Sequence, residues 1–192
     1  MTSIPPWNLS AVLPPIRPGQ PGHSSDRSPY RVSLVEVVER FAHSHERIRI
    51  LRGLVDYRKE LFQAGMNHGF QWLNGSFMEH KEALEGNAPN DIDIVTFYLL
   101  PGNLSQEALI TNHPQLFDRE KIQESYPVDA FYHQLGDPLV PSDVRQVPYY
   151  YSMWSHRRNG VWKGFVEVKL SSEEDDQATA LLDHMEREGG RP

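Results

Sequence analysis

The apolar residues of this chain follow two periods, and the longer one predicts helices. Between residues 44 and 64, apolar side chains recur every three to four positions, which places them on one stripe of a helix: Ile48, Leu51, Leu54, Val55, Leu61 and Phe62. Ser44 stands where a helix cap is expected, and Gly65 ends the pattern. Ser33 and Glu36 form a capping-box pair that predicts a shorter helix just upstream.

Basic residues lie between the apolar positions of the longer helix, and we expect them on its solvated face: Arg47, Arg49, Arg52, Arg58 and Lys59. Acidic residues of the same helix are spaced to pair with them. The alternative is that these cations face a substrate.

Short apolar runs predict strands at residues 69–74, 91–100 and 127–132. Residues 105–124 are expected to be mostly helical, with an interruption at Pro114, and the acidic stretch 172–188 predicts a final helix. These elements indicate an α+β fold in which a mixed β-sheet carries packed helices.

Two further β-prone runs, residues 149–154 and 161–170, flank an Asn159–Gly160 turn, which predicts a C-terminal β-hairpin. Its tip carries three cations beside aromatic residues: Arg157, Arg158 and Lys163. They are placed to hold phosphates or a base, and a solvated hairpin tip is the alternative.

Residues 1–30 are rich in proline and predict an extended arm. Trp7, Leu13 and Ile16 are apolar enough to lay this arm across the domain or a partner subunit; a partly disordered tail is the alternative. We therefore divide the chain into an arm (1–30), a main domain (31–170) and a C-terminal acidic helix and tail (171–192).

Composition limits the classes of function. The chain has 192 residues, of which 39% are hydrophobic, enough for one well-packed domain. It has no cysteine, which excludes disulfides and thiolate chemistry. The net charge of −7 argues against an extended nucleic-acid interface. We see no signal peptide and no apolar run long enough for a bilayer, and we expect a cytoplasmic protein without membrane contact.

The chemistry gathers around residues 69–94. Asp91 and Asp93 are two positions apart, so on a strand their side chains leave one face with the Cα atoms about 7 Å apart. Two such carboxylates favour a hard divalent cation between them and substrate phosphates. Upstream, Gly75–Ser76 with Glu79 reads as a glycine turn followed by a capping box, and a helix N-terminus suits phosphate oxygens. This combination indicates a nucleoside triphosphate site.

Gly75–Ser76 followed by Asp91–Ile92–Asp93 resembles the signature of the DNA-polymerase-beta-type nucleotidyltransferase superfamily. The longer string of residues 69–77 with 89–93 resembles a small bacterial branch of nucleotidyltransferase-like proteins of unknown function. The resemblance implies a minimal nucleotidyltransferase fold, extended here by the C-terminal hairpin and helix.

The resemblance also implies roles. Asp91, Asp93 and Asp129 would be the catalytic carboxylates and hold Mg²⁺ or Mn²⁺, with Asp129 helping to activate the attacking hydroxyl. Gly75 and Ser76 would position the phosphates of ATP or another nucleoside triphosphate. For Lys81, one turn further on, two interpretations stay open: it reaches a phosphate, or it is solvated. The acceptor is open between a protein side chain, a small molecule and, last, RNA.

Two alternatives stay open. Asp129 would otherwise be a helix-capping or salt-bridged residue at a strand edge. The segment 77–81 lacks the second glycine common in this turn, which motivates a second hypothesis: a non-catalytic member of the fold that serves as a regulatory or protein-binding module. Such a protein would act as a homo-oligomer or with a partner protein.

Overall fold

The computed structural model describes residues 3–102, 104–136 and 138–187. Within them the chain forms an α+β domain with five strands and seven α-helices. In chain order these are β1 (Tyr30–Val32), α1 (Leu34–Phe41), α2 (His45–Gln63), β2 (Gly69–Asn74), α3 (Lys81–Glu85), β3 (Ile92–Leu99), α4 (Gln106–Asn112), α5 (Arg119–Ser125), β4 (Val128–Leu135), α6 (Pro141–Trp154), β5 (Val166–Lys169) and α7 (Ser172–Arg187). Two short 3₁₀ turns, η1 (Ser76–Met78) and η2 (Pro114–Leu116), complete the set.

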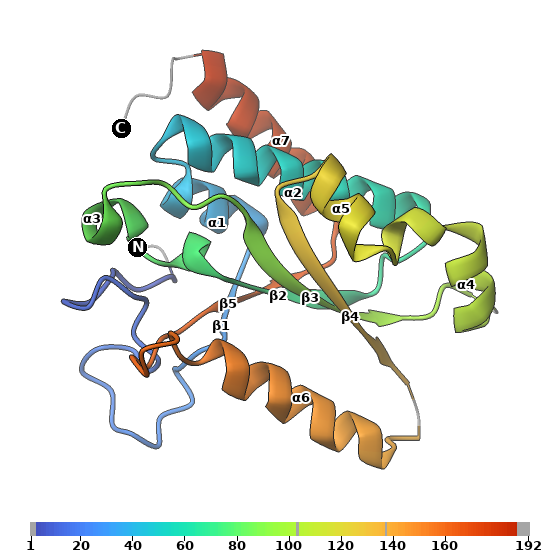
Figure 1. The fold of residues 1–192 in the computed structure, drawn as a ribbon, viewed down its shortest axis with the longest axis horizontal. Helices are drawn as coiled ribbons and strands as arrows, with labels where there is room; N and C mark the ends of the chain where they lie inside the picture. The colour runs from blue at the N-terminus through green and yellow to red at the C-terminus, as the bar shows by residue number, and fades with distance from the viewer. Residues whose placement is uncertain (1–2, 103, 137, 188–192) are drawn as a thin grey trace.

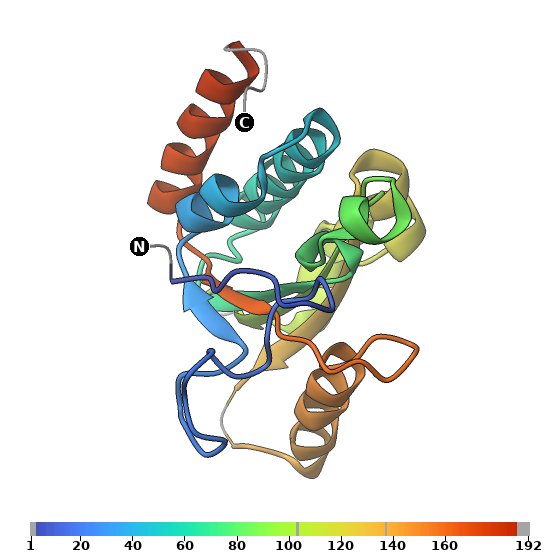
Figure 2. The ribbon, with the colours of Figure 1, turned by 90° about the vertical axis from the view of Figure 1, so that its left-hand side faces the viewer.

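The five strands form one mixed sheet in the order β1-β5-β2-β3-β4. β2 runs antiparallel to both of its neighbours, β3 and β5, whereas the pairs β1–β5 and β3–β4 are parallel. Helices α1, α2 and α7 lie together on one face of this sheet, and α6 lies on the other (Figure 1 and Figure 2).

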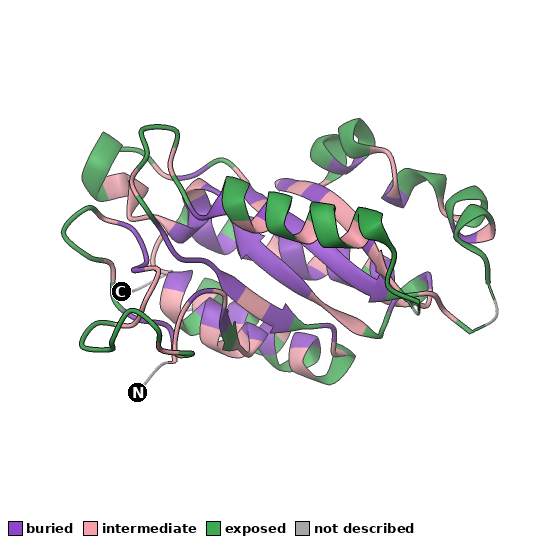
Figure 3. Ribbon diagram, turned by 90° about the horizontal axis from the view of Figure 1, so that it is seen from below, coloured by how far each residue is buried: buried purple, intermediate pink, exposed green. Residues whose placement is uncertain are grey.

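Strand alternation divides the apolar side chains between these two faces. Toward α1, α2 and α7 the sheet contributes residues such as Leu73, Ile94 and Val168 to the larger core. Toward α6 a smaller aromatic core is made by Trp72, Val95, Phe97, Tyr150, Trp154 and Phe165. The outer side of α6 is exposed, while the strands beneath it are buried (Figure 3).

Several predicted elements are confirmed. The strand at 69–74 has the expected bounds, and the strand expected at 91–100 is β3. Ser33 and Glu36 form the expected capping box: the Ser33 hydroxyl accepts from Glu36 N–H at 3.1 Å, and Glu36 Oε2 accepts from Ser33 N–H at 2.9 Å. Ser44 caps α2 through the N–H of Arg47.

The predicted C-terminal hairpin is wrong: residues 149–154 belong to helix α6. Of the second run, 161–170, only Val166–Lys169 form a strand, and this strand, β5, pairs with β1 and β2. Asp143 at the start of that helix accepts from Val140 N–H at 3.0 Å, and Tyr150 and Trp154, four residues apart, both bury their rings against the sheet. Tertiary packing therefore overrides the β-propensity of the aromatic run. The Asn159–Gly160 turn does form, closed by a bond from Gly160 N–H to Arg157 O at 2.9 Å.

The expectation that the cations of α2 are solvated is wrong for Arg47 and Arg58, whose side chains are fully buried. Arg58 donates to both carboxylate oxygens of Asp175 in α7, at 2.6 and 2.7 Å. It also donates to Gln71 in β2 at 2.6 Å. Arg58 thus joins the C-terminal helix to the sheet.

The described part of the N-terminal arm lies across the domain, as the apolar residues of the arm suggested. Ile4, Val12 and Leu13 are buried. The indole N–H of Trp7 donates to Met78 O at 2.8 Å, and its ring stacks on His80 with centroids 4.3 Å apart. The arm therefore supports the η1 turn directly. No helix of the described residues has the length and apolar character needed to cross a membrane.

Candidate functional site

Three polar residues lie side by side where the smaller aromatic core beneath α6 ends. Asp93 in β3 is in register with Asn74 on β2 and with Asp129 on β4, so all three leave the face that carries α6. Helix α6 stops at this level, and Asn74 Nδ2 donates to the carbonyl of Trp154, its last residue, at 2.9 Å. Beyond that residue the sheet face opens into a cleft.

The cleft has a volume of about 990 Å³ and is lined from five parts of the chain. It brings together all six residues that the sequence nominated: Gly75, Ser76, Lys81, Asp91, Asp93 and Asp129. The remaining wall comes from the end of α6 and the loop after it, together with Asn74, Glu79 and Arg119.

Gly75 has φ +79°, a region that favours glycine. A Cβ at this position would stand 2.9 Å from Asp93 Cγ and 3.0 Å from Asp93 Oδ2. The absence of a side chain therefore lets the Asp93 carboxylate lie against the backbone of the turn. This contact joins the two halves of the motif that the sequence paired only by spacing.

The capping box predicted at Ser76 and Glu79 is wrong. Ser76 begins a single 3₁₀ turn without a side-chain cap, and the next α-helix starts only at Lys81 and has five residues. The expected helix N-terminus for phosphate is thus absent at Ser76 in the described structure. Ser76 is nevertheless one of the residues that line the cleft.

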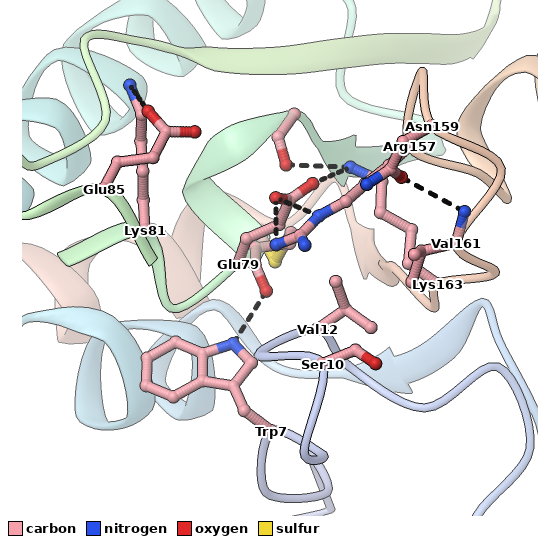
Figure 4. Close-up of polar contacts among 12 residues, drawn as sticks. Trp7, Ser10, Val12, Glu79, Lys81, Glu85, Arg157, Asn159, Val161 and Lys163 are labelled. Carbon is pink, nitrogen blue, oxygen red and sulfur yellow. Dashed lines mark hydrogen bonds and ion pairs between the residues drawn. The ribbon is translucent and has the colours of Figure 1, made fainter. Parts of the chain in front are cut away.

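Glu79 is occupied by two cations from the loop after α6 (Figure 4). Its carboxylate accepts from Arg157 Nε at 2.7 Å and from Lys163 Nζ at 2.8 Å, and Lys163 also donates to Gly75 O at 3.1 Å. Burial alone would raise the pKa of Glu79, but these two cations outweigh it and the pKa is lowered. The tie holds the glycine turn to the loop.

The ion pairs of Glu79 correct the prediction for Arg157, Arg158 and Lys163, the three cations expected at a hairpin tip. Arg157 and Lys163 are committed to Glu79, so they are structural in this state. Arg158 lines the cleft, is exposed, and forms no ion pair with another described residue. Lys81 also lines the cleft, and its ammonium is 3.6 Å from the Glu85 carboxylate. Unlike Arg157 and Lys163, Arg158 and Lys81 are thus not paired with Glu79.

The two carboxylates of the Asp-x-Asp motif are hard to ionise together. Burial raises the pKa of Asp93 to about 6, and the negative charges of Asp91 and Asp129 add to the effect. Burial, and then the charge of Asp129, also raise the pKa of Asp91. A cation bound between these groups would relieve the repulsion.

Asp129 is not free. Arg119, the first residue of α5, donates from Nε to Oδ1 and from Nη2 to Oδ2, both at 2.6 Å. The salt-bridged alternative for Asp129 is therefore present in this structure. The sequence did not single out Arg119, and the signal that could have found it is its place at a helix start ten residues before Asp129.

Some of the oxygen-bearing side chains that line the cleft are suited to bind a hard divalent cation. Besides Asp91 and Asp93, the cleft is lined by Asn74, whose Oδ1 is a buried oxygen without a hydrogen-bond partner among the described residues. Such an orphaned acceptor is rare in folded proteins and fits an oxygen ligand of a cation. Across the described ranges, no three His, Cys, Asp or Glu side chains are grouped closely enough to hold a metal ion.

The comparison with known families gives one result. A family of unknown function (DUF6932) matches residues 5–169. The chain belongs to this family. The match takes in residues 5–30 of the arm, the whole sheet and every residue of the cleft, and it ends before α7. No curated protein and no solved structure matches the chain.

Proposed function

We propose that this member of DUF6932 is a divalent-metal-dependent nucleotidyltransferase with a minimal nucleotidyltransferase fold. One observation carries the proposal: the Gly75–Ser76 turn and the Asp91/Asp93 pair, sixteen positions apart at their first residues, line a single cleft and touch through Gly75 and Asp93. Asp129 stands in register beside Asp93 in the same cleft. These are the residues that the superfamily signature assigns to the reaction.

Asp91, Asp93 and the oxygen of Asn74 are the groups that would hold Mg²⁺ or Mn²⁺, and Asp129 would join them once its pair with Arg119 opens. When bound, the cation supplies charge neutralisation at the phosphates and at the attacking oxygen. The Gly75–Ser76 turn offers its backbone and its hydroxyl to the triphosphate, and Lys81 and Arg158 add positive charge.

The reaction transfers a nucleoside monophosphate from ATP or another nucleoside triphosphate. An acceptor hydroxyl gives up its proton to a carboxylate, for which Asp129 is the proposed base, and its oxygen forms a bond to the α-phosphorus. The bond from that phosphorus to the β-phosphate oxygen breaks, and pyrophosphate leaves. The chain's part in this step is positioning and electrostatic stabilisation.

The acceptor is a protein side chain or a small molecule. The net charge of −7 disfavours RNA, whose binding relies on many basic contacts. We place the reaction in the cytoplasm, in line with a chain that has no cysteine.

Binding calorimetry tests the proposal. Wild-type protein should bind Mg²⁺–ATP, and the double variant Asp91→Asn/Asp93→Asn, shown by circular dichroism to be folded, should lose that binding. Asp56→Asn removes a charge from an exposed aspartate of α2 and is the control. A folded wild type that does not bind Mg²⁺–ATP would contradict the proposal.

The second candidate is a regulatory or protein-binding module that keeps the fold without catalysis. The pairing of both Asp129 oxygens with Arg119 favours it, because in this state the third carboxylate serves as a structural ion pair. This candidate predicts a stable complex with a partner protein, or a homo-oligomer, that survives substitution of all three aspartates. Dissociation of the complex in that triple variant would count against it.

A further inference from the structure

The ion pair between Arg119 and Asp129 lies in the wall of the cleft, and its two partners differ in exposure. The Arg119 side chain is 56% exposed, whereas that of Asp129 is 14% exposed. The guanidinium also stands over the ring of Phe131, with Cζ 5.1 Å from the ring centroid, and Phe131 lines the same cleft. Arg119 is therefore an exposed cation paired with a mostly buried carboxylate.

The guanidinium of Arg119 could bind a phosphate of a triphosphate in place of the Asp129 carboxylate. A guanidinium that makes two parallel N–H···O bonds to a carboxylate can make the same two bonds to a phosphate. An exposed ion pair contributes little to stability, so exchanging one anion for the other costs little.

Asp129 has an alternative partner as well. It is the third carboxylate of the cleft, beside Asp91 and Asp93, and each of its two oxygens accepts a hydrogen bond from Arg119. A divalent cation at Asp91 and Asp93 that also takes an oxygen of Asp129 must compete with this guanidinium.

We propose that Arg119 is a phosphate-binding residue stored on Asp129: when cation and nucleotide enter the cleft, Asp129 turns to the cation and Arg119 transfers to a phosphate oxygen. The inference rests on the proposed function and adds a residue and an exchange that the superfamily signature does not contain. In the nucleotide-free protein Arg119 competes with the cation, and in the complex it binds the nucleotide. Its removal should therefore shift the two affinities in opposite directions.

The test measures both affinities in Arg119→Gln and in a matched control. Lys121→Gln removes one positive charge from the same helix, from an exposed lysine paired with Asp118 outside the cleft. Binding of Mn²⁺ alone is followed by the loss of its free electron paramagnetic resonance signal, and binding of Mg²⁺–ATP by calorimetry. Arg119→Gln should tighten Mn²⁺ binding by up to about fivefold, the factor equivalent to an exposed ion pair. It should weaken Mg²⁺–ATP binding by roughly tenfold or more, as expected for one charge-assisted contact.

The outcomes separate this inference from the proposed function. Opposite shifts in Arg119→Gln, with Lys121→Gln like wild type, support the exchange. If wild type binds both ligands and the two variants behave alike, the exchange is wrong and the proposed function stands. If neither wild type nor Arg119→Gln binds Mn²⁺ or Mg²⁺–ATP, both proposals fail.

An independent readout is the Nε–H signal of Arg119 in ¹⁵N-labelled protein, assigned by its loss in Arg119→Gln. It should shift on addition of Mg²⁺–ATP if the guanidinium changes partner. A signal that stays in place in saturated protein would overturn the exchange.

Discussion

The carboxylate of Asp93 lies against Gly75, so close that a Cβ on the glycine would stand 2.9 Å from Asp93 Cγ. Gly75→Ala should therefore displace Asp93 as well as strain the turn, and lower the unfolding free energy by roughly 2 kcal/mol or more. Gly86→Ala is the control: Gly86 also has a positive φ, +72°, but open space around its Cβ position. Urea denaturation of both variants measures the difference. Equal losses would show that the contact with Asp93 has no energetic weight.

The raised pKa of Asp93 predicts that replacing this carboxylate with a neutral side chain stabilises the fold, and that the size of the effect depends on pH. A carboxyl whose pKa rises from 3.8 to about 6 on folding favours the folded state fully below pH 3.8, and this contribution is lost as the pH rises through 6. Asp93→Asn should thus stabilise the metal-free protein by roughly 2 kcal/mol at pH 7.5 and by little at pH 4. Thermal unfolding at the two pH values measures this gap. A gap that is the same at both would contradict the burial and charge repulsion assigned to Asp93.

The same pKa predicts how cation affinity depends on pH. A metal ion needs the ionised carboxylate, so Mn²⁺ affinity should increase as the pH rises from 5 to 7. Asp93→Asn should weaken binding and flatten this dependence. Paramagnetic titrations across that range measure it, and an unchanged profile in the variant would exclude Asp93 as a ligand.

Glu79 should stabilise the fold through its two cations. Glu79→Gln leaves Arg157 and Lys163, whose side chains are 15% and 7% exposed, without a charged partner, and should cost roughly 2 kcal/mol at pH 7. Because the pKa of Glu79 is lowered on folding, its stabilisation is present above the ordinary value of 4.5 and is lost as the pH falls below it. The deficit of the variant should therefore close in acid.

Glu85→Gln is the matched control for Glu79→Gln. Glu85 is 57% exposed and its contact with Lys81 is long, at 3.6 Å, so its loss should change the unfolding free energy by less than about 0.5 kcal/mol. Chemical denaturation at pH 7 and pH 4 compares the two. A deficit of Glu79→Gln that is as large at pH 4 as at pH 7 would mean that packing, not charge, is the cause.

Arg58 and Asp175 form a buried pair that joins α2 to α7. Arg58→Met leaves a buried carboxylate without its partner and should cost about 3–5 kcal/mol. The double variant Arg58→Met/Asp175→Leu removes both charges and should recover most of that loss. Double-mutant denaturation curves measure the recovery. Additive losses in the double variant would show that the two residues do not act as a pair.

The parts of the fold that local patterns specify could be predicted from the sequence. The capping box at Ser33, the apolar stripe of α2 and the buried run at 69–74 depend on neighbours in the chain. The grouping of Gly75, Asp91 and Asp93 was also predictable, because antiparallel pairing of β2 with β3 brings the end of one strand to the start of the other.

The features that were missed depend on contacts distant in sequence. Helix α6 forms because Tyr150 and Trp154 bury their rings on the second face of the sheet, which the aromatic run alone does not reveal. Arg58 is buried because Asp175, 117 residues later, compensates its charge. Glu79 does not form the expected capping box with Ser76, because its carboxylate pairs with Arg157 and Lys163 from the loop after α6.

The most direct test of nucleotidyl transfer is to incubate the protein with each α-labelled nucleoside triphosphate and Mg²⁺ or Mn²⁺ in cell lysate. Asp91→Ala/Asp93→Ala is the control. The proposal predicts that label moves onto a macromolecule or a metabolite with wild type only, and the labelled species identifies the acceptor class. Folded wild-type protein that transfers label from none of the nucleotides, or a double variant that transfers as much as wild type, would contradict it.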